Sequence, residues 1–92
     1  MIKSFQHRGL KRFFEDDNPR RLPHDMLERV SLILARLERA KAIEVLDVHS
    51  YHLHELTGNR KGPWSVTVRA NWRITFSFED GHAYDANFED YH

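Results

Sequence analysis

The sequence predicts an α+β domain in which two N-terminal helices pack on one face of a twisted, mainly antiparallel sheet. Two patterns predict this class. Apolar residues in the first half recur at helical spacing, whereas residues 64–78 alternate between apolar and polar side chains with the period of a strand. With 92 residues and a mass of 11.0 kDa, the chain is large enough for one modest core, so we expect residues 1–92 to form a single domain.

The N-terminal segment predicts a short strand followed by a short helix. Residues 2–5 alternate weakly, as a strand does. Leu10, Phe13 and Phe14 then follow the i, i+3, i+4 spacing of one helix face. This helix should end before Pro19, because the residue that precedes a proline disfavours helical backbone angles.

A second, longer helix is predicted to begin near Pro23, since proline is suited to the first helical position. It carries one continuous apolar stripe: Met26, Leu27, Val30, Ile33, Leu34 and Leu37. Residues 42–47 are predicted to form one further helical turn. This second helix is therefore the element expected to cover the sheet.

The remaining elements are predicted strands. Residues 51–56 alternate in character, and residues 57–63 are rich in turn formers. Further strands begin at Trp64 and Trp72, and a last strand follows the Asp80–Gly81 turn. Because the apolar side chains of these strands share one face, the opposite, polar face should stay open.

The predicted register keeps the apolar residues of neighbouring strands on one face. We expect three-residue loops at residues 69–71 and 79–81, with Asn71 and Gly81 in the left-handed backbone conformation. These loops give four cross-strand pairs: Val68–Trp72, Phe76–Tyr84, Ile74–Ala86 and Trp72–Phe88. The presence of Asn71 can therefore be explained by the left-handed conformation of the loop, which competes with the explanation that Asn71 has a role in function.

The composition excludes several classes of function. Without cysteine, the chain has neither a disulfide framework nor a zinc–thiolate site. No stretch approaches the roughly 20 apolar residues of a membrane span, so we expect a cytoplasmic protein with no membrane partner. The formal net charge of +0 argues against nucleic-acid binding through bulk charge, but residues 1–61 hold 12 basic residues against nine acids. This distribution of charge is therefore compatible with one basic surface that faces RNA.

The seven histidines raise the question of a metal site. His49, His52 and His54 are close in sequence, yet their spacing matches no common metal motif. We therefore predict no metal and no cofactor, and keep a metal-dependent hydrolase as a minor alternative.

The polar face of the predicted sheet carries residues suited to RNA cleavage. The predicted register places Thr67, Arg73 and Asn87 side by side, and the planar fork of Arg73 can grip two phosphate oxygens. His92 supplies an imidazole that can take or give a proton near neutral pH. Metal-free cleavage of RNA needs both groups, because a 2′-hydroxyl loses its proton while negative charge grows on phosphorus. These residues indicate a small ribonuclease.

Two observations weigh against this interpretation. Arg73 is equally compatible with a surface ion pair to a nearby acid such as Asp85 or Glu89. Residues 90–92 alternate between the two faces of a regular strand, so only an irregular strand end would gather all three side chains.

Several segments together have a family-specific pattern. They are Met1–Phe5, His7, Gly9–Lys11, Phe14, Leu53–His54, Leu56, Gly58, Trp64–Ser65, Val68–Phe76 and Glu89–His92. With these segments the chain resembles, from end to end, the HigB toxins of the RelE/ParE superfamily. These are the plasmid-maintenance killer proteins of bacterial type II toxin–antitoxin systems.

The resemblance implies a RelE-like fold and a ribonuclease that enters the A site of the 70S ribosome, next to 16S rRNA, and cuts mRNA there. It implies attack of a 2′-hydroxyl on the adjacent phosphate without a metal, leaving a cyclic phosphate and a 5′-hydroxyl. Arg73 would stabilise the phosphate, and Asp90, Tyr91 and His92 would form a terminal catalytic cluster. The implied partner is a HigA-like helix-turn-helix antitoxin.

The resemblance also implies a set of mRNA-binding residues. These are His54, Thr57, Arg60, Lys61, Arg69 and Asn71. Related toxins tend to have a lysine where this chain has Thr57, and we expect Arg60 or Lys61 to replace its charge. Two alternatives stay open: a ParE-like poison of DNA gyrase, and a catalytically weak module that only binds an antitoxin.

Overall fold

A computed structural model describes residues 1–57 and 62–90. Within them, two α-helices, three short 3₁₀ helices and four strands form the α+β arrangement predicted from the sequence. The helices are α1 (Arg8–Asp16), η1 (His24–Met26), α2 (Leu27–Arg39), η2 (Ile43–Leu46) and η3 (His49–Tyr51). The strands are β1 (His54–Glu55), β2 (Trp64–Arg69), β3 (Trp72–Glu79) and β4 (His82–Asp90).

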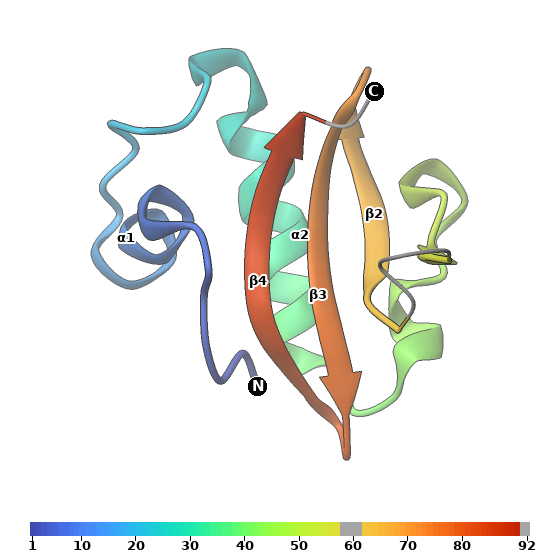
Figure 1. The fold of residues 1–92 in the computed structure, drawn as a ribbon. Helices are drawn as coiled ribbons and strands as arrows, with labels where there is room; N and C mark the ends of the chain where they lie inside the picture. Colours follow the sequence, from blue (N-terminus) through green and yellow to red (C-terminus); the bar gives the residue numbers. More distant parts are fainter. Residues whose placement is uncertain (58–61, 91–92) are drawn as a thin grey trace.

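The described strands form one antiparallel sheet in the order β1-β2-β3-β4. The predicted first strand at residues 2–5 appears as two isolated parallel bridges to β4, Ile2–Ala83 and Phe5–Ala86. In Figure 1 this N-terminal segment passes between α1 and β4. The outer edge of β4 is therefore paired with the start of the chain.

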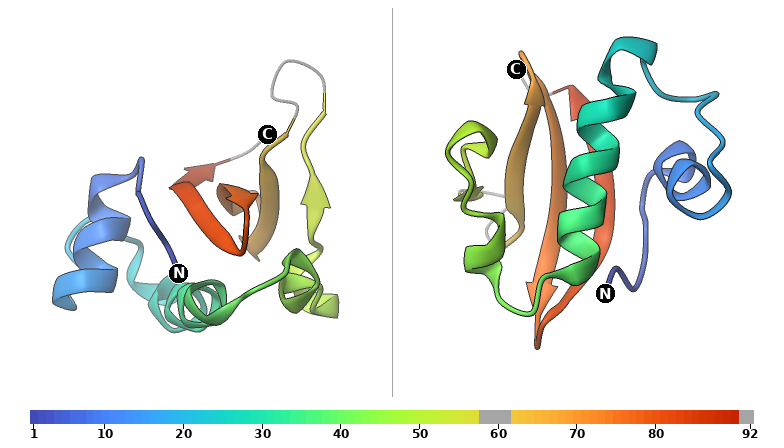
Figure 2. Two further views of the ribbon diagram at one scale, coloured as in Figure 1. Left: turned by 90° about the horizontal axis from the view of Figure 1, so that it is seen from below. Right: turned by 180° about the vertical axis from the view of Figure 1, so that it is seen from behind.

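The core lies between α2 and one face of the sheet. Val30, Ile33, Leu34 and Leu37 of the predicted apolar stripe are at most 1% exposed, and they pack in one cluster with sheet residues such as Ile74. Figure 2 shows α2 lying along the back of the sheet, with α1 beside it. Helical spacing thus determines which face of the sheet is closed and which one is left open.

Helix α1 ends where the sequence predicts. Asp17 adopts the left-handed conformation (φ 55°), and its backbone N–H donates to the carbonyl oxygen of Phe13. The N–H of Asn18 donates to the carbonyl oxygen of Arg12 at 3.2 Å, which completes a closed helix terminus. The chain is thereby turned back toward the start of α1.

The strand predicted at residues 51–56 is too long. Only His54–Glu55 pair with β2, and Tyr51 belongs to a 3₁₀ turn. Tyr51 is buried beneath the guanidinium of Arg29, whose carbon lies 4.8 Å from the ring centroid, so tertiary packing overrides the local alternation. The further turn predicted at residues 42–47 exists as η2, separated from α2 by the extended backbone of Ala40.

Both hairpin loops are two residues long, so the predicted three-residue loops are wrong. Asp80 and Gly81 both have positive φ (53° and 78°), as a type I′ turn requires, and in the other turn Ala70 rather than Asn71 is left-handed (φ 51°). None of the four predicted cross-strand pairs is present; the observed pairs include Arg69–Trp72, Ile74–Phe88 and Ser77–Tyr84.

Two bulges explain this difference. One extra residue at Val68 in β2, and one at Asp85–Ala86 in β4, shift the register inside the strands. Asp85 adopts positive φ (56°) at its bulge. Because each bulge restores the apolar face after a short turn, the face pattern alone cannot distinguish a longer loop from a bulge.

Candidate functional site

The candidate site is the face of the sheet opposite α2, which none of the described helices covers (Figure 1). Cross-strand pairing arranges its polar side chains in two rows. The first row is His54, Ser65, Thr75 and Asn87, and the second is Thr67, Arg73 and Glu89. We call this surface the open face.

Arg73 lies at the centre of the second row, as the sequence predicts. Its Nη1 donates to the carbonyl oxygens of Ala70 at 2.7 Å and Trp72 at 3.3 Å, which ties the guanidinium to the β2–β3 turn. Within residues 1–57 and 62–90, Arg73 forms no ion pair with Asp85 or Glu89. The alternative explanation as a surface ion pair is therefore not supported by the described contacts.

Glu89 is the neighbour of Arg73 on β4, in the position that the predicted register gave to Asn87. Its Oε2 accepts a hydrogen bond of 2.5 Å from the hydroxyl of Thr75, a side chain only 2% exposed. The sequence-based site omitted this pair, because only the bulge at Asp85–Ala86 moves Glu89 opposite Arg73. The open face thus holds a fixed carboxylate beside its central cation.

Arg69 and Asn71 flank this centre differently. Arg69 forms an ion pair with Asp25 of η1, and both side chains are about 60% exposed (61% and 62%). This places Arg69 against the helical layer and not beside Arg73. Asn71 is exposed in the β2–β3 turn, where Ala70 supplies the left-handed conformation, so the structural explanation for Asn71 is wrong.

The remaining described candidates are His54 and Thr57 near β1 and Asp90 at the end of β4, and the pairing of Asp90 with Trp72 places Asp90 on the face of Phe88 and not on the open face. His54 is exposed on β1, with Nδ1 at 3.4 Å from the carbonyl oxygen of His52, and Thr57 is exposed three residues later. Asp90 is exposed at the end of β4, opposite Trp72. The predicted residues Arg60, Lys61, Tyr91 and His92 lie outside the described residues.

A family model described as the RelE-like toxin of the type II toxin–antitoxin system HigB matches residues 3–92. The chain belongs to this HigB family. It is also 49% identical over 92 residues to a protein named Endoribonuclease HigB from Proteus vulgaris, and the match covers the whole of both chains.

Two further features of this HigB-family chain bear on its chemistry. Among the described residues, no group of three or more histidine, aspartate or glutamate side chains is arranged to hold a metal ion. His49 and His52 lie with ring centroids 6.1 Å apart, but no other described side chain completes a metal-binding set with them. In the same part of the chain, no helix is long and apolar enough to cross a membrane.

Proposed function

We propose that this HigB-family toxin, acting as one domain over residues 1–92, is a metal-independent endoribonuclease that cuts mRNA on the ribosome. The observation that carries the proposal is the anchored guanidinium of Arg73 at the centre of an open polar face. Full-length similarity to a protein named an endoribonuclease supports it.

The proposed reaction is attack of a 2′-hydroxyl on the adjacent phosphate, with a cyclic phosphate and a 5′-hydroxyl as products. Since Nη1 of Arg73 is held by backbone carbonyls, its Nε–Nη2 edge is the side from which two parallel hydrogen bonds can reach a phosphate. These bonds strengthen as negative charge grows in the transition state. In this reaction His92 is the group that takes or gives a proton. Asp90 and Tyr91 act with it as the terminal catalytic cluster.

The mRNA strand would cross the open face from β1 to β4. Three strand spacings of about 4.8 Å separate His54 from Asn87, a width of about 14 Å. His54 and Asn71 position the strand, together with the basic residues Arg60 and Lys61, whereas Arg69 is paired with Asp25 on the helical side. We expect Arg60 or Lys61 to supply the charge that Thr57 lacks.

The partners we propose are the 70S ribosome, with its 16S rRNA, and a HigA-like helix-turn-helix antitoxin. A protein with formal net charge +0 gains little affinity for free RNA from bulk charge, so it benefits from a ribosome that already holds the mRNA. Because translation takes place there, we place the activity in the bacterial cytoplasm.

Arg73→Ala tests this function. Wild type and variant are induced without antitoxin, growth is followed, and primer extension on a reporter mRNA maps the cuts. We expect codon-phased cuts and growth arrest with wild type, and cleavage reduced on the order of 10²-fold in Arg73→Ala. Arg39→Ala, which removes an exposed arginine at the end of α2, is the matched control and should cut normally.

Equal cleavage by Arg73→Ala and wild type would refute the assigned site. Growth arrest without cuts would instead favour a gyrase poison, and neither arrest nor cuts would favour an antitoxin-binding module. Circular dichroism establishes that each variant is folded.

A further inference from the structure

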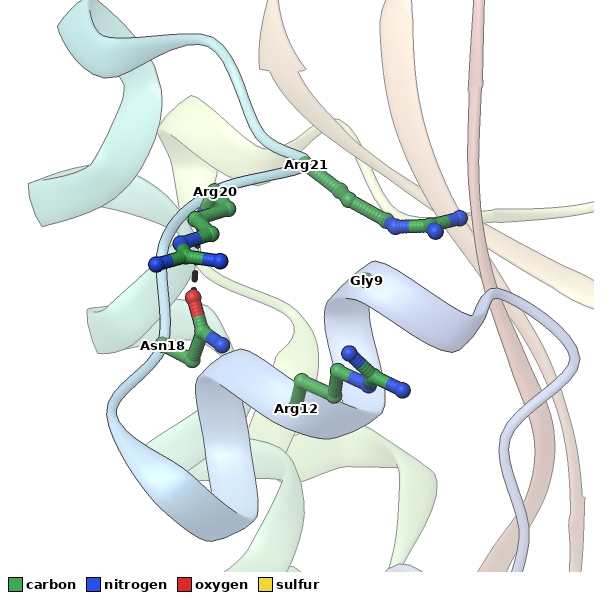
Figure 3. A pocket seen from close by; sticks show the side chains of 5 residues that line it. All are labelled: Gly9, Arg12, Asn18, Arg20 and Arg21. Carbon is green, nitrogen blue, oxygen red and sulfur yellow. Dashed lines mark hydrogen bonds between the residues drawn. The ribbon is translucent and has the colours of Figure 1, made fainter.

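A second basic site lies outside the open face, between α1 and the loop that follows it. A cavity of about 130 Å³ is lined there by Gly9, Arg12, Asn18, Arg20 and Arg21 (Figure 3). No acidic residue is among these described lining residues. We call this the arginine pocket.

Backbone contacts fix the loop that carries two of the arginines. The Oδ1 of Asn18 accepts a hydrogen bond of 3.2 Å from the backbone N–H of Arg20 (Figure 3). The N–H of Leu22 donates to the carbonyl oxygen of Pro19 at 3.1 Å, and the Leu22 side chain is buried. The pocket is thus formed by a folded loop rather than by side chains that happen to be near one another.

Gly9 allows this loop to lie directly on the first turn of α1. A Cβ atom at Gly9 would lie 2.5 Å from the Cβ of Arg21 and 2.9 Å from the Cε1 of His7, both far below van der Waals contact. Figure 3 shows the Arg21 side chain extending past Gly9. The missing side chain therefore sets the distance between the loop and α1.

The positive charges of the pocket are not neutralised by the described residues. Within residues 1–57 and 62–90, Arg12, Arg20 and Arg21 form no ion pair, although Arg69 and Asp25 do. The charge of Arg21 also contributes, after burial, to lowering the pKa of His7. Because Arg12, Arg20 and Arg21 line one cavity, their positive charges add there, and an anion in the pocket would be attracted by all three.

We propose that the arginine pocket binds a phosphodiester group of RNA. This inference rests on the proposed function, which makes RNA the polyanion at hand. A tetrahedral phosphate offers oxygens to several guanidinium forks at once, which a planar carboxylate does less well. His7, two residues before Gly9 of the pocket, packs its ring edge-on against Phe88 of β4, two residues before Asp90. The phosphate can come from the cut mRNA or from ribosomal RNA.

Binding measurements on the full chain separate these sources. The probes are a short single-stranded RNA with 2′-O-methyl sugars, which lacks the attacking hydroxyl, and ribosomes free of mRNA. The double variant Arg12→Gln/Arg21→Gln is compared with Arg8→Gln/Lys11→Gln, which removes the same charge from exposed α1 residues outside the pocket.

For the pocket variant we expect about tenfold weaker binding at low salt and a salt slope smaller by about 0.7 on the single strand, as for one lost phosphate contact. The control should change affinity about twofold or less. Weakening on the oligonucleotide assigns the phosphate to the message, and weakening only on ribosomes assigns it to ribosomal RNA. Equal affinities of the two double variants for both probes would overturn the proposal.

Gly9→Ala tests the geometry without changing the charge. If it folds, as judged by circular dichroism, it should weaken RNA binding severalfold because the loop must move away from α1. Unchanged binding would indicate a diffuse basic surface in place of a pocket. The loss of binding caused by Arg12→Gln/Arg21→Gln should persist in an Arg73→Ala background that no longer cleaves, so failure of the proposed cleavage and failure of the pocket give different results.

Discussion

The guanidinium of Arg73 is held in one orientation by the backbone of its own hairpin. A free arginine loses much rotamer entropy when it grips a ligand, whereas Arg73 is already held by two backbone carbonyl oxygens of its own hairpin. Glu89 is fixed in the same way by a buried threonine hydroxyl. The charges at the centre of the open face are therefore oriented in the free protein, and in the proposed reaction this would favour stabilisation of the transition state.

His7 is a titratable residue among the described ones whose surroundings clearly shift its pKa. Its Nδ1 accepts a hydrogen bond of 3.0 Å from the N–H of Leu10 at the start of α1, and its ring packs on Phe88. Burial, and then the charge of Arg21, lower the pKa of His7 from 6.5. The neutral imidazole is thus the form that caps the helix.

We predict that this contribution to stability is fully present above pH 6.5 and is lost as the pH falls through the lowered pKa, because the unfolded chain then binds the proton more readily. Urea unfolding of wild type and His7→Asn at several pH values measures it. Asparagine keeps a capping oxygen but does not titrate, so the difference in unfolding free energy should shrink or reverse in acid. A difference independent of pH would contradict the assignment.

At the scale of elements, the β2–β3 turn carries avoidable strain. Ala70 occupies the left-handed region (φ 51°), which costs a residue with a Cβ about 1–2 kcal/mol. Its carbonyl oxygen is also the closer of the two acceptors that hold Arg73. The conformation of this one turn therefore affects both stability and the site.

We predict that Ala70→Gly raises the unfolding free energy by about 0.5–1 kcal/mol, because relief of the strain exceeds the added entropy of the unfolded chain. Chemical denaturation measures this effect. Ala35→Gly within α2 should have the opposite sign and cost about 1 kcal/mol. Destabilisation by Ala70→Gly would show that the methyl group makes a contact that outweighs the strain.

The elements also show what the sequence could predict. The stripe from Met26 to Leu37 identified α2, because one helix face must be apolar to cover a sheet. The strand register could not be predicted from the sequence, because the bulges at Val68 and at Asp85–Ala86 are stabilised by groups that are distant in sequence. Arg29 donates to the carbonyl oxygens of Thr67 and Val68 at 3.2 Å each.

The same limits apply to the candidate site. The pairing of Thr67 with Arg73 was predicted correctly, because the extra residue of the bulge at Val68 offsets a loop that is one residue shorter than predicted. Glu89 was missed because its position depends on the bulge in β4. That bulge is held by Ser4, whose Oγ accepts a 2.9 Å hydrogen bond from the N–H of Asp85 across 81 positions of sequence. Local alternation contains no signal for such a contact.

At the scale of the whole molecule, the start of the chain completes the sheet. The N–H groups of Lys3 and Gln6 donate to the carbonyl oxygens of Ala83 and Ala86 at 2.7 and 2.8 Å. Ile2 is buried at 8% exposure, and its own N–H donates to Glu38 of α2. The N-terminal segment thus ties β4 to the helical layer.

Removing residues 2–5 should therefore destabilise the protein more than Ile2→Ala does. Ile2→Ala loses apolar burial, at a cost of about 2–5 kcal/mol. The deletion also breaks several backbone hydrogen bonds worth about 0.5–1.5 kcal/mol each, so we expect a further loss of about 2 kcal/mol or more. Urea unfolding of both variants gives the comparison, and equal losses would show that the backbone pairing contributes nothing.

The pairing of β4 has a consequence for self-association. An unpaired strand edge is a template onto which another chain can add a strand, and natural proteins block such edges. In the described part of this sheet one edge is occupied by residues 2–5, and the other is β1, which is only two residues long. An open polar face can therefore coexist with sheet edges on which another chain cannot easily add a strand.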